Sequence, residues 1–174
     1  MTSPATVRRT GVTLRPPAGA DRAAVEGILR ATGVFRADEV AVGLEVFDAA
    51  AAGDPSYRSL IAECDGAVAG WICWGPTPCT VGTWDMYWLA VAPAMHGAGI
   101  GTRLVDEMER RLAGVARLVV VETAGRPDYA PTRAFYEARG YRRAATIPDF
   151  YAPDDDQVVY LKYFAPSTDS HEGR

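Results

Sequence analysis

Three glycines at alternate positions, Gly97, Gly99 and Gly101, form the most suggestive chemical pattern in this sequence. An apolar run that ends at Val91 precedes them, and a stretch with helical spacing of apolar residues follows. A glycine loop that opens a helix presents free amide N–H groups at the positive end of the helix dipole. The pattern therefore predicts a site for an anion, and phosphate suits it best.

The glycine loop can be interpreted in several ways. A Walker loop needs a lysine before its Ser or Thr, and no lysine precedes Thr102. A dinucleotide fingerprint is favoured by Glu122, about twenty residues further on, but that motif has the spacing G-x-G-x-x-G and its first glycine directly follows the strand. A turn without ligand is the simplest alternative, although glycines so close together cost backbone entropy.

Several carboxylates stand where they could do proton chemistry. Asp85 is the lone acidic residue in an aromatic strand, and Glu122 ends an apolar strand, where ligands gather in open α/β sheets. The run Asp154 to Asp156 has two interpretations. It is either a solvated turn or an acidic loop over a cleft that attracts a cationic substrate.

Composition is that of an ordinary globular domain. The 174 residues are 48% hydrophobic and 23% charged, with a net charge of −4, which argues against nucleic-acid binding. Three cysteines without a CxxC pair and two histidines predict neither a disulfide framework nor a metal site. Without a secretory signal or a membrane-spanning run, we expect a cytoplasmic protein. We expect one domain over 11–164 between flexible tails, 1–10 and 165–174.

The glycine loop needs a scaffold, and the apolar periodicity predicts one. Strands are expected over 12–16, 83–91 and 117–123, the last buried on both faces, with a hairpin over 59–75 that turns at Asp65-Gly66. Helices are expected over 20–32, 37–53 and 131–140 and from Ile100 onward, where apolar residues recur every four positions. A last strand pair, 141–147 and 158–164, is joined by a loop over 148–157. The order β-α-α-β-β-β-α-β-α-β-β predicts a mixed α/β sheet.

Two further motifs accompany the loop, and together they resemble one family. The segment from His96 to Gly101 is similar to the pyrophosphate loop of the GNAT superfamily of N-acetyltransferases, and "AFYEARGY" resembles its FYxxxGF signature. Val91 and Pro93 match the end of its fourth strand. The resemblance covers 11–164. It implies the GNAT fold, a mixed, mostly antiparallel sheet of about seven strands flanked by about four helices.

The same resemblance implies acetyl-CoA as cosubstrate and a primary amine of a small molecule or peptide as acceptor. An amine with a pKa near 10.4 is about 99.9% protonated at neutral pH, so a base is needed. Asp85 or Glu122 is the expected base, acting through water, although Asp85 could simply face solvent. Tyr136 is the expected acid for the leaving thiolate, with packing as its alternative role, and Phe135 is expected to face the core.

The resemblance also implies which residues bind the cofactor. They are Leu89, Ala90, Val91, His96, Gly97, Ala98, Gly99, Ile100, Gly101, Thr102, Tyr129 and Phe135. Two of them depart from the family pattern. His96 replaces the usual Gln or Arg and can either cap the loop or donate to a phosphate, and Tyr129 stands where Asn is common.

Three functions are compatible with these residues. The leading prediction is a GNAT-family N-acetyltransferase. An acyl-CoA sensor of the same fold, without turnover, is the alternative, and a nucleotide-dependent oxidoreductase is a third. We expect neither a nucleic acid nor a membrane as partner. The oligomeric state stays open, with a homodimer as one option.

Overall fold

The computed structural model describes residues 11–164, so both predicted tails, 1–10 and 165–174, lie outside the described residues. The strands and helices follow the predicted order. They are β1 (Val12–Arg15), α1 (Arg22–Ala31), α2 (Ala37–Ala51), β2 (Arg58–Cys64), β3 (Ala67–Pro76), β4 (Thr83–Val91), α3 (Ile100–Leu112), β5 (Leu118–Ala124), α4 (Ala130–Ala138), β6 (Arg142–Ala152) and β7 (Asp155–Tyr163).

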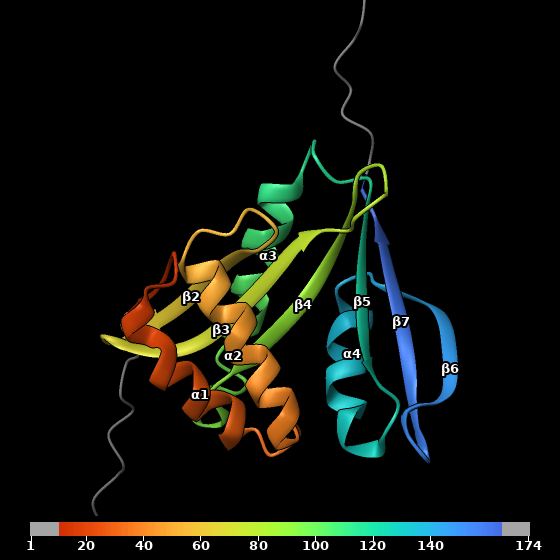
Figure 1. Cartoon of the computed structure of the whole chain (residues 1–174), viewed down its shortest axis with the longest axis horizontal. Helices are drawn as coiled ribbons and strands as arrows, with labels where there is room; N and C mark the ends of the chain where they lie inside the picture. The colour runs from red at the N-terminus through yellow and green to blue at the C-terminus, as the bar shows by residue number, and fades with distance from the viewer. Residues whose placement is uncertain (1–10, 165–174) are drawn as a thin grey trace, which may run out of the picture.

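The seven strands over 11–164 form one sheet in the order β1-β2-β3-β4-β5-β7-β6 (Figure 1). All neighbouring strands are antiparallel except β4 and β5, which run parallel. The predicted fold class, a mixed and mostly antiparallel sheet flanked by four helices, is confirmed.

Two hydrophobic clusters attach helices to opposite faces of the sheet. Val25 and Leu29 of α1 and Phe47 of α2 pack with Trp71 of β3 on one face. On the other face, the α3 residues predicted from their four-residue spacing pack against the sheet, together with Tyr136 of α4. These α3 residues are Ile100, Leu104, Met108 and Leu112, and all are at most 2% exposed. Helices therefore cover both faces of the sheet.

The sheet opens between β4 and β5. Their pairing runs only from Thr83↔Leu118 to Met86↔Val121, whereas β4 continues to Val91. In Figure 1 the two strands lie together at one end and diverge toward the other. On its other side β4 carries an irregularity, because Cys73 pairs with Trp88 but Trp74 pairs with Met86. Tyr87 is thus the extra residue of a bulge, and a bulge bends its strand, so β4 turns away from β5 where their pairing ends.

Two expectations about β5 and the C-terminal strands are wrong. β5 is buried on one face only: Val119 and Val121 lie in the core, but Val120 is half-buried and Glu122 is exposed. The predicted loop 148–157 is largely strand, because β6 and β7 extend to a tight turn around Asp154. β6 is an exposed edge strand, so it lacks the apolar alternation by which strands are recognised.

Candidate active site

A cavity of about 850 Å³ lies at the opening between β4 and β5. Its walls come from the α1–α2 connection, β4, the glycine loop, β5, α4 and β7. Of the cofactor-binding residues expected from the sequence, eleven line it: Leu89, Ala90, Val91, His96, Gly97, Gly99, Ile100, Gly101, Thr102, Tyr129 and Phe135. Ala98 is not among the lining residues.

The glycine loop has the geometry of an anion site. Gly97 and Gly99 adopt φ of +76° and +78°, a left-handed conformation that side-chain-bearing residues rarely take. Within the described residues, no hydrogen bond engages the amides of Ile100, Gly101 and Thr102, the first three of α3. A Cβ on Gly97 or Gly99 would meet no protein atom within 4 Å. The loop therefore offers unpaired donors and open space, which fit a pyrophosphate.

His96 holds this loop against the strand before it. Its Nε2 lies 3.0 Å from the carbonyl oxygen of Val91. Of its two expected roles, capping the loop therefore fits the structure better than donation of a hydrogen bond by Nε2 to a phosphate.

Tyr136 is buried and lines the cavity. Only 6% of the residue is exposed, and its ring packs against Phe135, Tyr141 and Tyr160. Burial raises the pKa of its hydroxyl, so the group stays protonated at neutral pH. Phe135 is half-buried and packs against the same core cluster, so both residues of the pair contact the core and Tyr136 is the more deeply buried of the two.

The two candidate bases have different surroundings. Glu122 lines the cavity, and its Oε2 accepts a hydrogen bond of 3.0 Å from Nε2 of Gln157. Desolvation, and then the negative charge of Asp85, raise the pKa of Glu122. Asp85 does not line the cavity, and its Oδ2 accepts a hydrogen bond of 2.7 Å from the Thr77 hydroxyl. Glu122 is therefore the better-placed candidate.

The acidic run does not form a loop over the cavity. Asp154 lies exposed at the β6–β7 turn with φ of 62°, and Asp156 accepts a hydrogen bond from the backbone amide of Asp149. Asp155, in contrast, is 5% exposed and lines the cavity. The interpretation as a solvated turn therefore fits Asp154, whereas Asp155 is the member of the run that lies at the cavity.

Other lining residues were missed in the sequence. Phe35 and Glu39 come from the α1–α2 region, and Arg126 and Tyr151 from the ends of β5 and β6. The sequence does carry a signal for Arg126, because it follows an apolar strand by two residues. The others carry no local signal, since only the tertiary fold brings them to the cavity.

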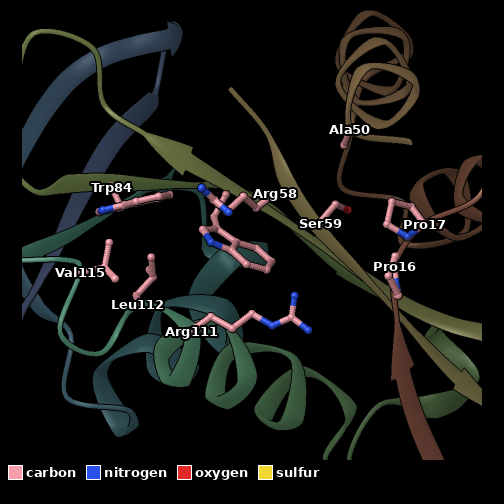
Figure 2. Close-up of a pocket in the computed structure, with 10 residues that line it drawn as sticks. Pro16, Pro17, Ala50, Arg58, Ser59, Trp84, Arg111, Leu112 and Val115 are labelled. Carbon is pink, nitrogen blue, oxygen red and sulfur yellow. The ribbon is translucent and has the colours of Figure 1, made fainter. Parts of the chain in front are cut away.

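A second, smaller cavity of about 420 Å³ lies elsewhere (Figure 2). Arg58 and Arg111 are its charged lining residues, and Trp84 stacks under the Arg58 guanidinium at 5.4 Å. None of the predicted catalytic or cofactor-binding residues reaches it. The larger cavity is therefore the candidate site.

Comparisons with known proteins agree with this geometry. Residues 28–141 match the model of the acetyltransferase (GNAT) family. A solved structure of a candidate GNAT acetyltransferase from Desulfovibrio desulfuricans is 37% identical, with a TM-score of 0.82, and the match covers 89% of this chain and 100% of that one.

Among the described residues, none of the helices is both long and apolar enough to cross a membrane.

Two curated proteins also resemble parts of the chain. An uncharacterized N-acetyltransferase of Methanocaldococcus jannaschii is 29% identical over 106 residues, which cover 59% of this chain and 64% of that protein. An L-2,4-diaminobutyric acid acetyltransferase of Nocardia farcinica is 31% identical over 110 residues, which cover 56% of this chain and 55% of that protein. The chain thus spans less than two thirds of the length of either curated relative.

Proposed function

The chain belongs to the acetyltransferase (GNAT) family, and we propose that it moves the acetyl group of acetyl-CoA directly to a primary amine. One observation carries this proposal. A single cavity holds unpaired amides suited to pyrophosphate, a carboxylate of raised pKa and a protonated tyrosine hydroxyl. Direct transfer needs an anchor for the donor, a base and an acid in one cavity, and these groups can serve as all three.

The donor would be held by the glycine loop. The amides of Ile100, Gly101 and Thr102 would receive the pyrophosphate, and the β4 segment from Leu89 to Val91 would line the path toward the reacting end. When bound, acetyl-CoA supplies a thioester carbonyl as electrophile and a thiolate as leaving group.

Glu122 is proposed as the base. The attacking amine must lose a proton, because about 99.9% of a lysine-like amine is protonated at neutral pH. A raised pKa makes Glu122 a stronger base than an ordinary glutamate, and its carboxylate lines the open cavity. Gln157 holds one of its oxygens in place and leaves the other to take the proton, directly or through water.

Tyr136 is proposed as the acid that donates a proton to the leaving thiolate. Its hydroxyl has no hydrogen-bond partner among the described residues, and it stays protonated. It can therefore donate to sulfur without first breaking a bond inside the protein.

The acceptor is proposed to be a small, cationic amine. Of the charged residues that line the cavity, four are carboxylates and one is a guanidinium, and such a surface favours positive ligands. The Nocardia farcinica relative is named for a small amino acid with two amines, which supports a small molecule over a peptide.

Release of free thiol from acetyl-CoA over a panel of amines tests this proposal. We expect thiol release that depends on a cationic primary amine, with an acetylated product of matching mass. The variant E122Q should bind CoA as the native protein does but lose about 10²–10⁴-fold in kcat. CoA binding without thiol release for any amine would instead favour the sensor.

A further inference from the structure

Asp155 is a buried carboxylate at the wall of the large cavity. The residue is 5% exposed, and its Oδ1 makes no hydrogen bond within the described part of the chain. Its nearest opposite charge is Nη1 of Arg126, 3.6 Å from Oδ2, which is longer than a hydrogen bond. Buried charged groups are normally both paired and hydrogen-bonded, so this carboxylate has capacity for a donor from a ligand.

Arg126 cannot supply that donor as it is placed. Its Nη2 donates to the carbonyl of Val34 at 3.0 Å, its Nε lies 3.3 Å from Oδ1 of Asp128, and its guanidinium lies over the Tyr129 ring at 5.1 Å. These contacts hold Arg126 between the α1–α2 connection and the segment after β5. The arginine offsets part of the charge here and leaves Oδ1 of Asp155 unpaired.

The charge around Asp155 favours a cation. Glu39 and Asp128 also line the cavity and carry the same negative charge as Asp155. All three carboxylates face an arginine at similar distances: Glu39 lies 3.7 Å from Arg36, and Asp128 and Asp155 lie 3.3 Å and 3.6 Å from Arg126. Asp155 differs in its burial, because it is 5% exposed and its Oδ1 has no hydrogen bond within the described residues. Glu39 accepts a hydrogen bond of 2.7 Å from the Arg36 amide, and Asp128 is exposed to solvent. An ammonium ligand would therefore pair with the buried carboxylate of Asp155.

The distance from Asp155 to the proposed base is set by the sheet. Asp155 and Gln157 are two positions apart on β7, so they project on the same face about 7 Å from each other. Gln157 in turn donates to Glu122 at 3.0 Å. Glu122 itself lies opposite Val159, four positions along β7 from Asp155 and on the same face, so the two residues are about 13 Å apart along the strand. With an ammonium about 3 Å inside each carboxylate, a ligand that reaches both needs two amines separated by about 7 Å.

We propose that Asp155 binds a second ammonium group of the acceptor, so that the preferred substrate is a short-chain diamine. This inference rests on the proposed acetyl transfer: one amine would lie at Glu122 and react, and the other would stay charged at Asp155. An extended chain of six bonds, each of which advances about 1.25 Å, spans the separation.

Three acceptors of similar length test the proposal: 1,5-diaminopentane, pentylamine and 6-aminohexanoate. We expect kcat/KM for the diamine to exceed that for pentylamine by about tenfold or more, the scale of one charge-assisted hydrogen bond. In D155N this ratio should fall about tenfold. D154N is the matched control, because it removes the same charge from the same hairpin outside the cavity, and its ratio should stay native.

Each alternative result has a separate meaning. Equal kcat/KM for diamine and monoamine, or an unchanged ratio in folded D155N, would overturn the role of Asp155 while leaving acetyl transfer intact. Preference for 6-aminohexanoate would overturn it too and point to Arg126 as a carboxylate site. Absence of thiol release with every amine would refute the proposed function itself. Calorimetry of 1,5-diaminopentane against the CoA-loaded native and D155N proteins would then decide the subsite by binding alone.

A second variant covers the case in which D155N does not fold. D155E keeps the charge but extends it by one methylene toward the cavity. We expect its preference to shift from 1,5-diaminopentane toward 1,4-diaminobutane, and an unshifted chain-length preference would contradict the subsite.

Discussion

Glu122 and Asp85 face the same side of neighbouring strands, because Asp85 pairs with Val120 and Glu122 lies two positions further along β5. The charge of Asp85 contributes to the raised pKa of Glu122. A carboxylate of raised pKa becomes an active base only at higher pH. The charge of Asp85 therefore influences the pH at which Glu122, the proposed base, can accept a proton.

The variant D85N should shift the pH profile of kcat. Loss of the negative charge stabilises the Glu122 carboxylate, so its pKa falls and the ascending limb moves to lower pH. The asparagine oxygen can still accept from Thr77, and the plateau of kcat should stay within about threefold of native, since the base is retained. A rate profile from pH 4 to 9 measures this. Loss of activity at every pH would identify Asp85, and not Glu122, as the base.

Tyr136→Phe removes one hydroxyl and leaves the ring that packs against Tyr141 and Tyr160. We expect unchanged CoA affinity and thermal stability, because that hydroxyl makes no hydrogen bond in the described residues. Both kcat and kcat/KM should fall together, by about 10–10²-fold, the pattern of an interaction made only in the transition state. Rapid-quench kinetics of the acetyl-transfer step is the measurement, and a native rate there would assign Tyr136 to packing.

At the scale of elements, the start of α3 is the proposed anchor for the cofactor. Gly101 is the best position to test it, because Gly97 and Gly99 have positive φ and any substitution there strains the backbone. A Cβ on Gly101 would meet Phe135 and Val91 at ordinary distances of 3.6 Å, and both of these residues line the cavity.

Gly101→Ala should therefore weaken CoA binding without harming the fold. We expect a loss of about tenfold in affinity, or ~1.4 kcal/mol, from the added methyl group. Alanine in place of a helical glycine should leave stability unchanged or raise it by up to about 1 kcal/mol. Gly27→Ala, an exposed glycine in α1 with open space around it, is the matched control. Calorimetric titration with CoA compares them, and equal affinities would contradict the anchor.

Most elements could be predicted because their signals are local. The apolar spacing of α3 and the Asp65-Gly66 turn each act within a few residues, and both predictions are confirmed. The bulge at Tyr87 could not be predicted, since it arises from the register of β3 against β4. The extended β6 was missed for a similar reason, because its pairing with β7, and not its own pattern, makes it a strand.

At the scale of the whole molecule, the net charge of −4 combines with a cavity rich in carboxylates. Salt should therefore weaken the capture of a cationic acceptor, because the Debye length shortens from about 10 Å at 0.1 M to about 3 Å at 1 M. Between about 0.1 M and about 1 M NaCl we expect KM for a diamine to rise several-fold while kcat changes little. An aromatic amine that is uncharged at neutral pH serves as control, and a parallel rise in its KM would exclude an electrostatic cause.

The site could be predicted from the sequence only in part. The side of the cavity proposed for the cofactor was largely predictable, because its glycines and the FY pair lie in short, continuous motifs. The side proposed for the acceptor was not, because it gathers Glu39, Arg126, Tyr151 and Asp155 from four separate segments. The run of three aspartates looks uniform in sequence, but only its middle member, Asp155, lies at the cavity. Asp154 precedes β7, and the side chain of Asp156 points to the other face of the strand.

The short pairing between β4 and β5 also affects the resistance of the chain to proteolysis. Strand pairing joins β1–β4 to β5–β7 over only four residue pairs, so the C-terminal strands have little backbone attachment against local opening. A molecule bound in the cavity contacts both parts of the sheet and stabilises the closed state by mass action. Proteases act on the transiently opened chain. The level of free acetyl-CoA would thus set the lifetime of the protein as well as its rate of turnover.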